Sequence, residues 1–119
     1  MLVLDTNIVI AYFAEEQAVV GALEKALAEG EMIVVPTIVQ AETMAYQTIG
    51  ASTLAQMREW FADTNTAVLD VNTAKRAAEI KRATGLKLID SIIAATTLEL
   101  NAKLISRDND FKKVREMER

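Results

Sequence analysis

Residues 1–13 read MLVLDTNIVIAYF, and this stretch decides how the rest of the chain is interpreted. The apolar run 1–4 predicts a short buried strand, and the run 8–13 predicts a helix that begins just after Asn7. Asp5 stands between the two, at the point where the strand ends. Asp, Thr and Asn are all good helix N-caps, so Asp5-Thr6-Asn7 is equally well interpreted as a cap or as part of a site. The other acidic residues must decide between these interpretations.

The alternation of strand and helix continues along the chain. Thr-x-x-Gln capping boxes at Thr37 and Thr53 predict helix starts, and Gly30, Gly50 and Gly85 predict helix ends. Further strands are predicted at 32–35, 67–71 and 103–106, and helices at 16–29, 37–49, 53–62, 73–84 and 88–100, with a short helix from 111 onward.

Strands that alternate with helices are typical of a parallel sheet that is covered on both faces. We therefore predict an α/β fold with three layers, α/β/α, around a central, mostly parallel sheet of four or five strands. A chain of 119 residues is long enough for one such core, so a single domain over 1–119 is expected.

Composition excludes several kinds of chemistry. The chain has neither Cys nor His, which rules out disulfides, thiolate catalysis, Ser-His-Asp triads and His-ligated zinc. Carboxylates, Lys, Tyr, Ser, Thr and oxygen-ligated metals remain. The net charge of −4 disfavours nucleic acid, unless the acids gather around a metal. No signal peptide or membrane span is predicted, and a cytoplasmic location fits.

Acidic residues interrupt the apolar pattern at four further positions. Glu42 shares a predicted helix face with apolar side chains, Asp90 stands in the first turn of a helix that is uncharged over 92–98, and Asp108 and Asp110 follow the last predicted strand. Each has a structural explanation: Glu42 as a solvated side chain, Asp90 as a first-turn acid favoured by the helix dipole, Asp108 and Asp110 as a polar turn.

These explanations leave the shared placement of the acids unaccounted for. Asp5 and Asp108 both follow strands, and the carboxyl ends of parallel strands meet at one edge of a sheet. A cluster of carboxylates cannot stay ionised without a cation, and Mg²⁺ or Mn²⁺ suits oxygen ligands. The sequence therefore predicts a divalent-metal site at this edge.

Four segments together resemble the PIN-domain family, and more narrowly the VapC-type toxins of toxin–antitoxin pairs: VLDTNIVI (3–10), VQAETMAY (39–46), KLIDSIIAATTLE (87–99) and LISRDNDF (104–111). The resemblance implies a Mg²⁺- or Mn²⁺-dependent endoribonuclease. It also implies that the catalytic, metal-binding quartet is Asp5, Glu42, Asp90 and Asp108. Asp110 would be a fifth ligand, Thr6 would orient ligands or the attacking water, and Asn7 would be structural.

The resemblance also implies partners. The substrate would be RNA, and Lys87 and Arg107 are the best candidates to contact its backbone, ahead of Lys112 and Lys113. An antitoxin would occlude the site, and homodimers are typical. The candidate apolar surface for a dimer, for which core packing is the other interpretation, consists of Tyr46, Ile49, Met57, Trp60 and Phe61.

Three points stay open at this stage. Such proteins commonly have a further strand after the RDNDF segment, where this chain reads KKVREMER, so the fifth strand is in question. A metal-dependent phosphatase is an alternative, although a haloacid-dehalogenase-like enzyme would have a second Asp at the position of Asn7. A PIN-like module that binds without catalysis is the other alternative.

Overall fold

The computed structural model describes residues 1–111 and residue 114 of the chain. Its centre is a four-stranded sheet in the order β3-β2-β1-β4. Every strand pairing in this sheet is parallel, as predicted. The strands are β1 (Leu2–Leu4), β2 (Ile33–Pro36), β3 (Asn65–Ala67) and β4 (Lys103–Ile105). A fifth strand is not present among the described residues.

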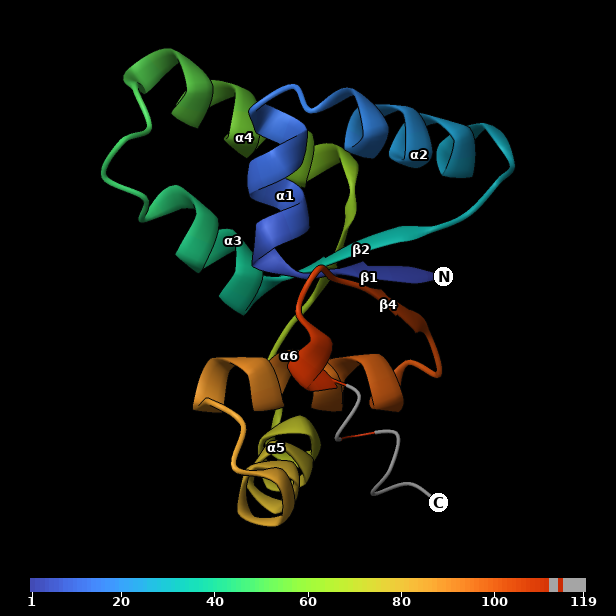
Figure 1. Ribbon diagram of the computed structural model, residues 1–119, viewed down its shortest axis with the longest axis vertical. Coiled ribbons are helices and arrows are strands. Elements are labelled where there is room, and N and C mark those ends of the chain that lie inside the picture. Colours follow the sequence, from blue (N-terminus) through green and yellow to red (C-terminus); the bar gives the residue numbers. More distant parts are fainter. Residues whose placement is uncertain (112–113, 115–119) are drawn as a thin grey trace.

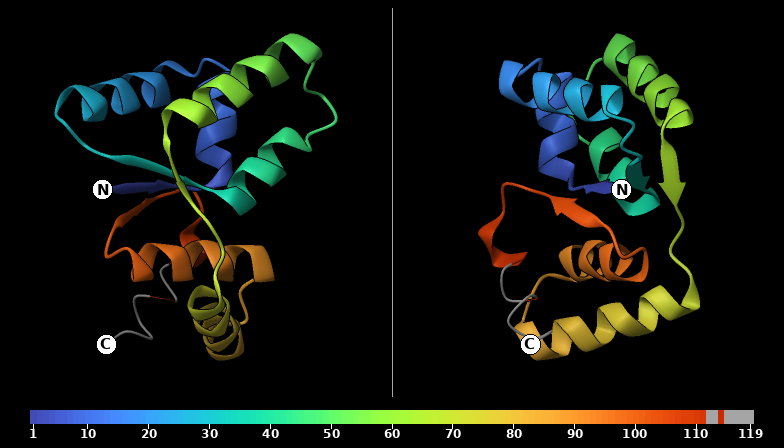
Figure 2. Two further views of the ribbon diagram at one scale, coloured as in Figure 1. Left: turned by 180° about the vertical axis from the view of Figure 1, so that it is seen from behind. Right: turned by 90° about the vertical axis from the view of Figure 1, so that its right-hand side faces the viewer.

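Within residues 1–111, six α-helices connect and cover these strands: α1 (Thr6–Phe13), α2 (Gln17–Ala28), α3 (Thr37–Met44), α4 (Ala51–Asp63), α5 (Val71–Thr84) and α6 (Leu88–Glu99). Figures 1 and 2 show α1 to α4 on one side of the sheet and α5 with α6 on the other. The predicted three-layer α/β/α architecture is therefore confirmed. No helix in the part of the chain that the structure describes is both long enough and apolar enough to cross a membrane.

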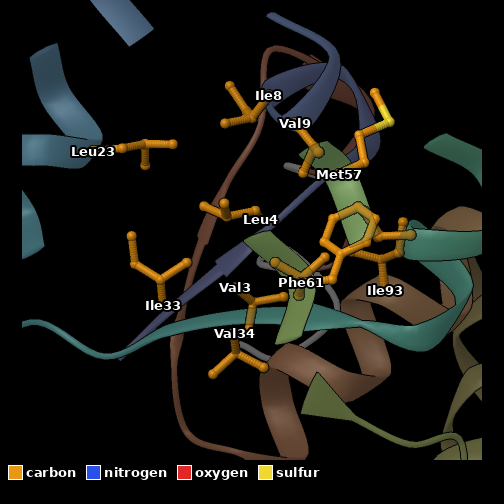
Figure 3. Packing of buried hydrophobic residues seen from close by; sticks show 12 residues of the cluster. Val3, Leu4, Ile8, Val9, Leu23, Ile33, Val34, Met57, Phe61 and Ile93 are labelled. Carbon is orange, nitrogen blue, oxygen red and sulfur yellow. The ribbon is translucent and has the colours of Figure 1, made fainter. Parts of the chain in front are cut away.

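The central strands are apolar along their whole length because helices cover both faces of the sheet. Val3 and Leu4 of β1 are fully buried, as is Val35 of β2. Figure 3 shows the main core cluster, in which strand side chains meet Ile8 and Val9 of α1 and Phe61 of α4. A second cluster joins α5 to α6 around Ile80 and Ala95. The core therefore fixes β1 rigidly, and with it the residue that follows.

The ends of helices α3 and α4 differ from the prediction. Neither predicted capping box forms, because the N-caps of α3 and α4 are Pro36 and Gly50, without side-chain cap bonds. The Gln40 side chain donates instead to the carbonyl of Val35 and to the hydroxyl of Thr66, both at 3.1 Å. Helix α3 ends at Met44 rather than at 49.

The third strand was placed too late in the chain. It covers Asn65–Ala67 instead of 67–71, and Val68 and Val71 are about 70% exposed. The start of α5 explains the error, because Asp70 caps this helix and the chain leaves the sheet before it. Gly85 ends α5 with a φ of +76°, the left-handed conformation that glycine adopts readily.

The region after β4 forms a short 3-10 helix, η1 (Asn109–Phe111). The helix predicted from 111 onward otherwise falls largely on residues 112–113 and 115–119, outside the described residues. The predicted helix at 88–100 is confirmed as α6 to within one residue.

Candidate active site at the carboxyl edge of the sheet

Asp5 is both a helix cap and a buried acid. Its Oδ1 accepts a hydrogen bond of 2.7 Å from the backbone N–H of Thr6, so it is the N-cap of α1. The helix therefore begins at Thr6, and not after Asn7 as predicted. Only 4% of Asp5 is exposed, because the residue follows the buried strand β1 directly. Capping and membership of a site are thus combined in one carboxylate.

Ser106 connects Asp5 to the end of β4. Its hydroxyl donates to Asp5 Oδ2 at 2.6 Å and accepts a hydrogen bond of 2.9 Å from the backbone N–H of Asp108. Asp108 Oδ1 in turn accepts from the N–H of Asp110 at 2.8 Å. Sequence reasoning missed Ser106. The available signal was a hydroxyl residue directly after the last strand, in ISRDNDF.

Thr6 holds Glu42 in place. The Thr6 hydroxyl donates to Glu42 Oε1 at 2.6 Å and joins the start of α1 to the middle of α3. Glu42 is half-buried and hydrogen-bonded. The alternative interpretation from the sequence, in which Glu42 is a freely solvated surface side chain, is therefore wrong. Because the Thr6 hydroxyl bonds only Oε1, the second carboxylate oxygen of Glu42 can accept another bond.

Four acids from four separate segments line one cavity of about 560 Å³: Asp5, Glu42, Asp90 and Asp108. Asp90 reaches it from the first turn of α6. Thr6 and Lys87 line the same cavity. The parallel sheet produces this convergence, since β1 and β4 both end at this edge and α3 follows β2 there.

Burial and neighbouring acids raise the pKa values of Asp5 and Asp90. Burial raises the pKa of Asp5 most, and the charges of Asp108 and Glu42 add to it, while hydrogen bonds from Ser106 and Thr6 oppose it. Burial also raises the pKa of Asp90, with contributions from Asp5, Asp108 and Glu42, and Lys87 opposes this shift. The cavity therefore disfavours a full set of negative charges and favours a cation.

The donor chemistry of the cavity fits a hard divalent metal. Its acids offer only oxygen ligands, which Mg²⁺ and Mn²⁺ prefer. Within residues 1–111 and 114, however, no group of three or more acidic side chains is already gathered to hold a metal ion. A bound metal would require these carboxylates to move toward it, and its positive charge would offset the burial and the repulsion that raise the pKa values of Asp5 and Asp90.

The remaining predicted site residues lie in different surroundings. Asp110 is exposed and does not line the cavity. The guanidinium of Arg107 forms a two-pronged ion pair with Glu16, at 3.0 and 3.1 Å, and its backbone N–H donates to Asn7 Oδ1 at 3.3 Å. Asn7 thus anchors the loop after β4. Lys112 and Lys113 lie outside the described residues.

The candidate dimer residues divide between core and surface. Met57 and Phe61 are 1% and 5% exposed and belong to the core, in agreement with the second interpretation of these residues. Trp60 and Ile49 are half-buried against the same core. Tyr46 is 50% exposed and lines the acidic cavity.

Comparison with known proteins gives a consistent result. The PIN domain family model matches residues 2–117. No curated protein sequence matches the chain. A solved toxin–antitoxin complex from Klebsiella pneumoniae is 28% identical, with a TM-score of 0.80, and the match covers 93% of this chain and 90% of that one.

Two more distant structures share the fold. VapBC2 from Rickettsia felis, bound to a promoter DNA fragment, is 16% identical with a TM-score of 0.79, covering 97% of this chain and 91% of that one. VapC20 from Mycobacterium tuberculosis, a sarcin-ricin loop cleaving toxin, is 15% identical with a TM-score of 0.77, covering 96% and 95%. Since the family model spans nearly the whole chain, the protein belongs to the PIN domain family.

Proposed function

We propose that this protein is a Mg²⁺- or Mn²⁺-dependent endoribonuclease and the toxin of a type II toxin–antitoxin pair. The observation that carries the proposal is the convergence of Asp5, Glu42, Asp90 and Asp108 on one cavity. These acids come from segments up to about 100 residues apart, and burial, together with the charges of the other acids, raises the pKa values of Asp5 and Asp90. Carboxylates with raised pKa values that share a cavity are typical of functional sites.

The roles of the acids follow from their surroundings. Asp5, Asp90 and Asp108 would hold the metal, and Glu42, oriented by the Thr6 hydroxyl, would position a second metal or the attacking water. Ser106, whose hydroxyl bonds both Asp5 and the backbone of Asp108, would hold these two residues at a fixed separation. When bound, the metal would lower the pKa of water and offset charge on the phosphate. The single domain over 1–119 and a cytoplasmic location remain predictions.

Lys87 is the candidate for the RNA backbone. It lines the cavity beside Asp90 and is exposed, so its ammonium group can reach a phosphate oxygen. Arg107 is a weaker candidate, because contact with RNA would compete with its ion pair to Glu16. We retain Asp110 as a proposed outer ligand, which would act through water from outside the cavity.

The proposed partner is a cognate antitoxin. Similarity to the toxin–antitoxin complex from Klebsiella pneumoniae supports this, since its identity is 28% over nearly the whole chain. A homodimer, expected from the family resemblance, is proposed as well. Co-expression with the protein encoded next to this gene, followed by co-purification, tests the first point.

A metal-restoration assay tests the activity. Protein stripped of metal with a chelator should cleave no RNA, and addition of Mg²⁺ or Mn²⁺ should restore cleavage with 5′-phosphate and 3′-hydroxyl products. Calcium of equal concentration serves as the control for charge alone. If RNA stays intact with either metal, the ribonuclease proposal is wrong. Release of phosphate from small phosphoesters alone would favour the phosphatase, and RNA binding without cleavage the non-catalytic module.

A further inference from the structure

The cavity at the carboxyl edge contains side chains that metal binding does not use. Among the described residues that line it, Tyr46 is the one aromatic side chain and Lys87 the one cation. Four acids can hold a metal, and a cation can contact a phosphate. The aromatic ring has no place in either task, so its position beside the acids needs its own explanation.

The backbone of Tyr46 is fixed while its side chain is half exposed. Its N–H donates to the carbonyl of Thr43 at 3.4 Å, and its carbonyl accepts from the N–H of Ile49 at 3.2 Å. Tyr46 as a whole residue is nevertheless 50% exposed. It stands four residues after Glu42, just beyond the end of α3. A ring on an anchored backbone, open to solvent, is suited to contact a ligand in the adjacent cavity.

A second exposed apolar residue lines the cavity. Leu88, at the first position of α6, lines the same cavity and is 55% exposed. Figure 1 shows the start of α6 and helix α3 at the same end of the sheet. An exposed tyrosine and an exposed leucine thus line the same cavity as four acids. These two side chains can contact a ligand through apolar surface, and such contacts do not depend on charge.

Charge alone is a poor means of holding RNA at this opening. The four acids repel phosphates, and one lysine offsets little of that repulsion. Base stacking on an aromatic side chain is insensitive to the sequence of the RNA, because every base has a π-face, and Tyr is suited to it. A base can stack on a protein ring only where its own stack in the RNA is open.

We propose that Tyr46 is a base-stacking platform at the rim of the site, on which one unpaired nucleobase packs while the RNA backbone passes Lys87. Tyr46 is then a positioning residue for the substrate and not a ligand of the metal. The inference rests on the proposed ribonuclease function and deepens it, since it assigns a substrate-contacting role to a residue outside the four acids.

The first test compares three variants for binding and cleavage of a short single-stranded RNA. Tyr46→Ala should weaken binding and raise KM by roughly 5- to 150-fold, the range of one lost stacking contact, with kcat little changed. Tyr46→Phe keeps the ring and should behave as the parent. Leu27→Ala is the matched control, because Leu27 is also 50% exposed but lies on α2 and does not line the cavity. Binding is measured in an Asp5→Asn background with Mg²⁺, so that cleavage does not interfere.

The second test identifies the stacked base. In a cleaved RNA, each nucleotide is replaced in turn by an abasic residue. At one position the replacement should raise KM for the parent and change it little for Tyr46→Ala, since the contact is already lost. The same RNA in a fully paired duplex should be a poor substrate for both proteins.

The outcomes separate the inference from the proposed function. If the parent cuts RNA and Tyr46→Ala binds and cuts as well as the parent, or if every abasic effect adds to that of Tyr46→Ala, the platform is wrong and the ribonuclease stands. A parent that neither binds nor cuts RNA overturns both. If Tyr46→Ala changes the oligomeric state in sedimentation and leaves RNA affinity unchanged, the ring contacts a second copy of this chain instead.

Discussion

Two stretches of this protein have nearly the same sequence and opposite surroundings. Residues 4–7 read LDTN and residues 69–72 read LDVN. In both, the Asp is the N-cap of the following helix and its Oδ1 accepts a backbone N–H bond, from Thr6 in one case and from Thr73 in the other. Local sequence alone would assign Asp5 and Asp70 the same role.

Their tertiary neighbours differ. Leu4 is fully buried in β1, whereas Leu69 is 41% exposed in a connection. Asp5 faces Ser106, Asp108 and Glu42, and its pKa is raised because burial and like charges disfavour the carboxylate. Asp70 is solvent-exposed, and hydrogen bonds from the N–H and hydroxyl of Thr73 lower its pKa. Ionisation of the capping carboxyl is therefore disfavoured at Asp5 and favoured at Asp70.

The largest expected difference between the two caps is in activity. Asp5→Asn should reduce RNA cleavage by more than the roughly 100-fold upper limit typical of residues that only support a metal ligand. Asp70→Asn should leave cleavage unchanged, since Asp70 does not line the acidic cavity. Single-turnover cleavage rates with excess Mg²⁺ measure both. Equal rates for Asp5→Asn and the parent would remove Asp5 from the active site.

Loss of the hydroxyl partner should have a smaller effect. Ser106→Ala removes the 2.6 Å bond to Asp5 and the acceptor for the Asp108 N–H, and should reduce cleavage roughly 10- to 100-fold. Ser106→Thr, which keeps the hydroxyl, should recover much of the rate. Thr73→Ala is the matched change at the second cap and should not alter cleavage. A Ser106→Ala rate equal to that of the parent contradicts this role.

The stability of the metal-free protein should respond to pH with opposite signs at the two caps. A carboxyl whose folded pKa is raised destabilises the fold as pH rises from its unfolded pKa through the folded value, and the loss persists above it. Asp5→Asn should therefore raise the Tm of metal-free protein at neutral pH. This gain should shrink as pH falls through the raised pKa of Asp5. A gain that is constant with pH would show that ionisation of Asp5 is not its cause.

The smallest effect is expected at the second cap. A carboxyl whose folded pKa is lowered contributes stability above its unfolded pKa, and this stability is lost as pH falls through the folded value. Asp70→Ala should thus lower Tm slightly at neutral pH, and the difference from the parent should shrink in acid. Thermal unfolding followed by circular dichroism over a pH series measures it. An increase in Tm at neutral pH would contradict the stabilising cap.

Much of the fold could be predicted because it depends on local pattern. The apolar run of β1 and the uncharged stretch of α6 are buried as expected, since a covered parallel sheet needs continuous apolar segments. One prediction that failed is the capping box at Thr37. Gln40 donates to Val35 and Thr66 instead of capping α3, and a sequence motif does not contain that choice.

Part of the candidate site could likewise be predicted from the sequence, and part could not. The chain order of strands and helices already required Asp5 and Asp108 to meet at one edge, and the family resemblance added Glu42 and Asp90. Residue spacing could not indicate that the Ser106 hydroxyl joins Asp5 to the backbone of Asp108, or that Tyr46 is exposed at the rim. Those facts depend on contacts between segments far apart in the chain.

The sequence by itself determined the alternation of buried strands and covering helices, and thereby the edge where the acids gather, because hydrophobic periodicity acts over a few residues. Asp5 was already a site candidate from the sequence, but only the tertiary structure decided that its carboxyl is buried beside other acids while that of Asp70 is exposed to solvent. A pKa is set by burial and by charges within a few ångströms, and the neighbours that supply them to Asp5 lie 37 to 103 positions later in the sequence.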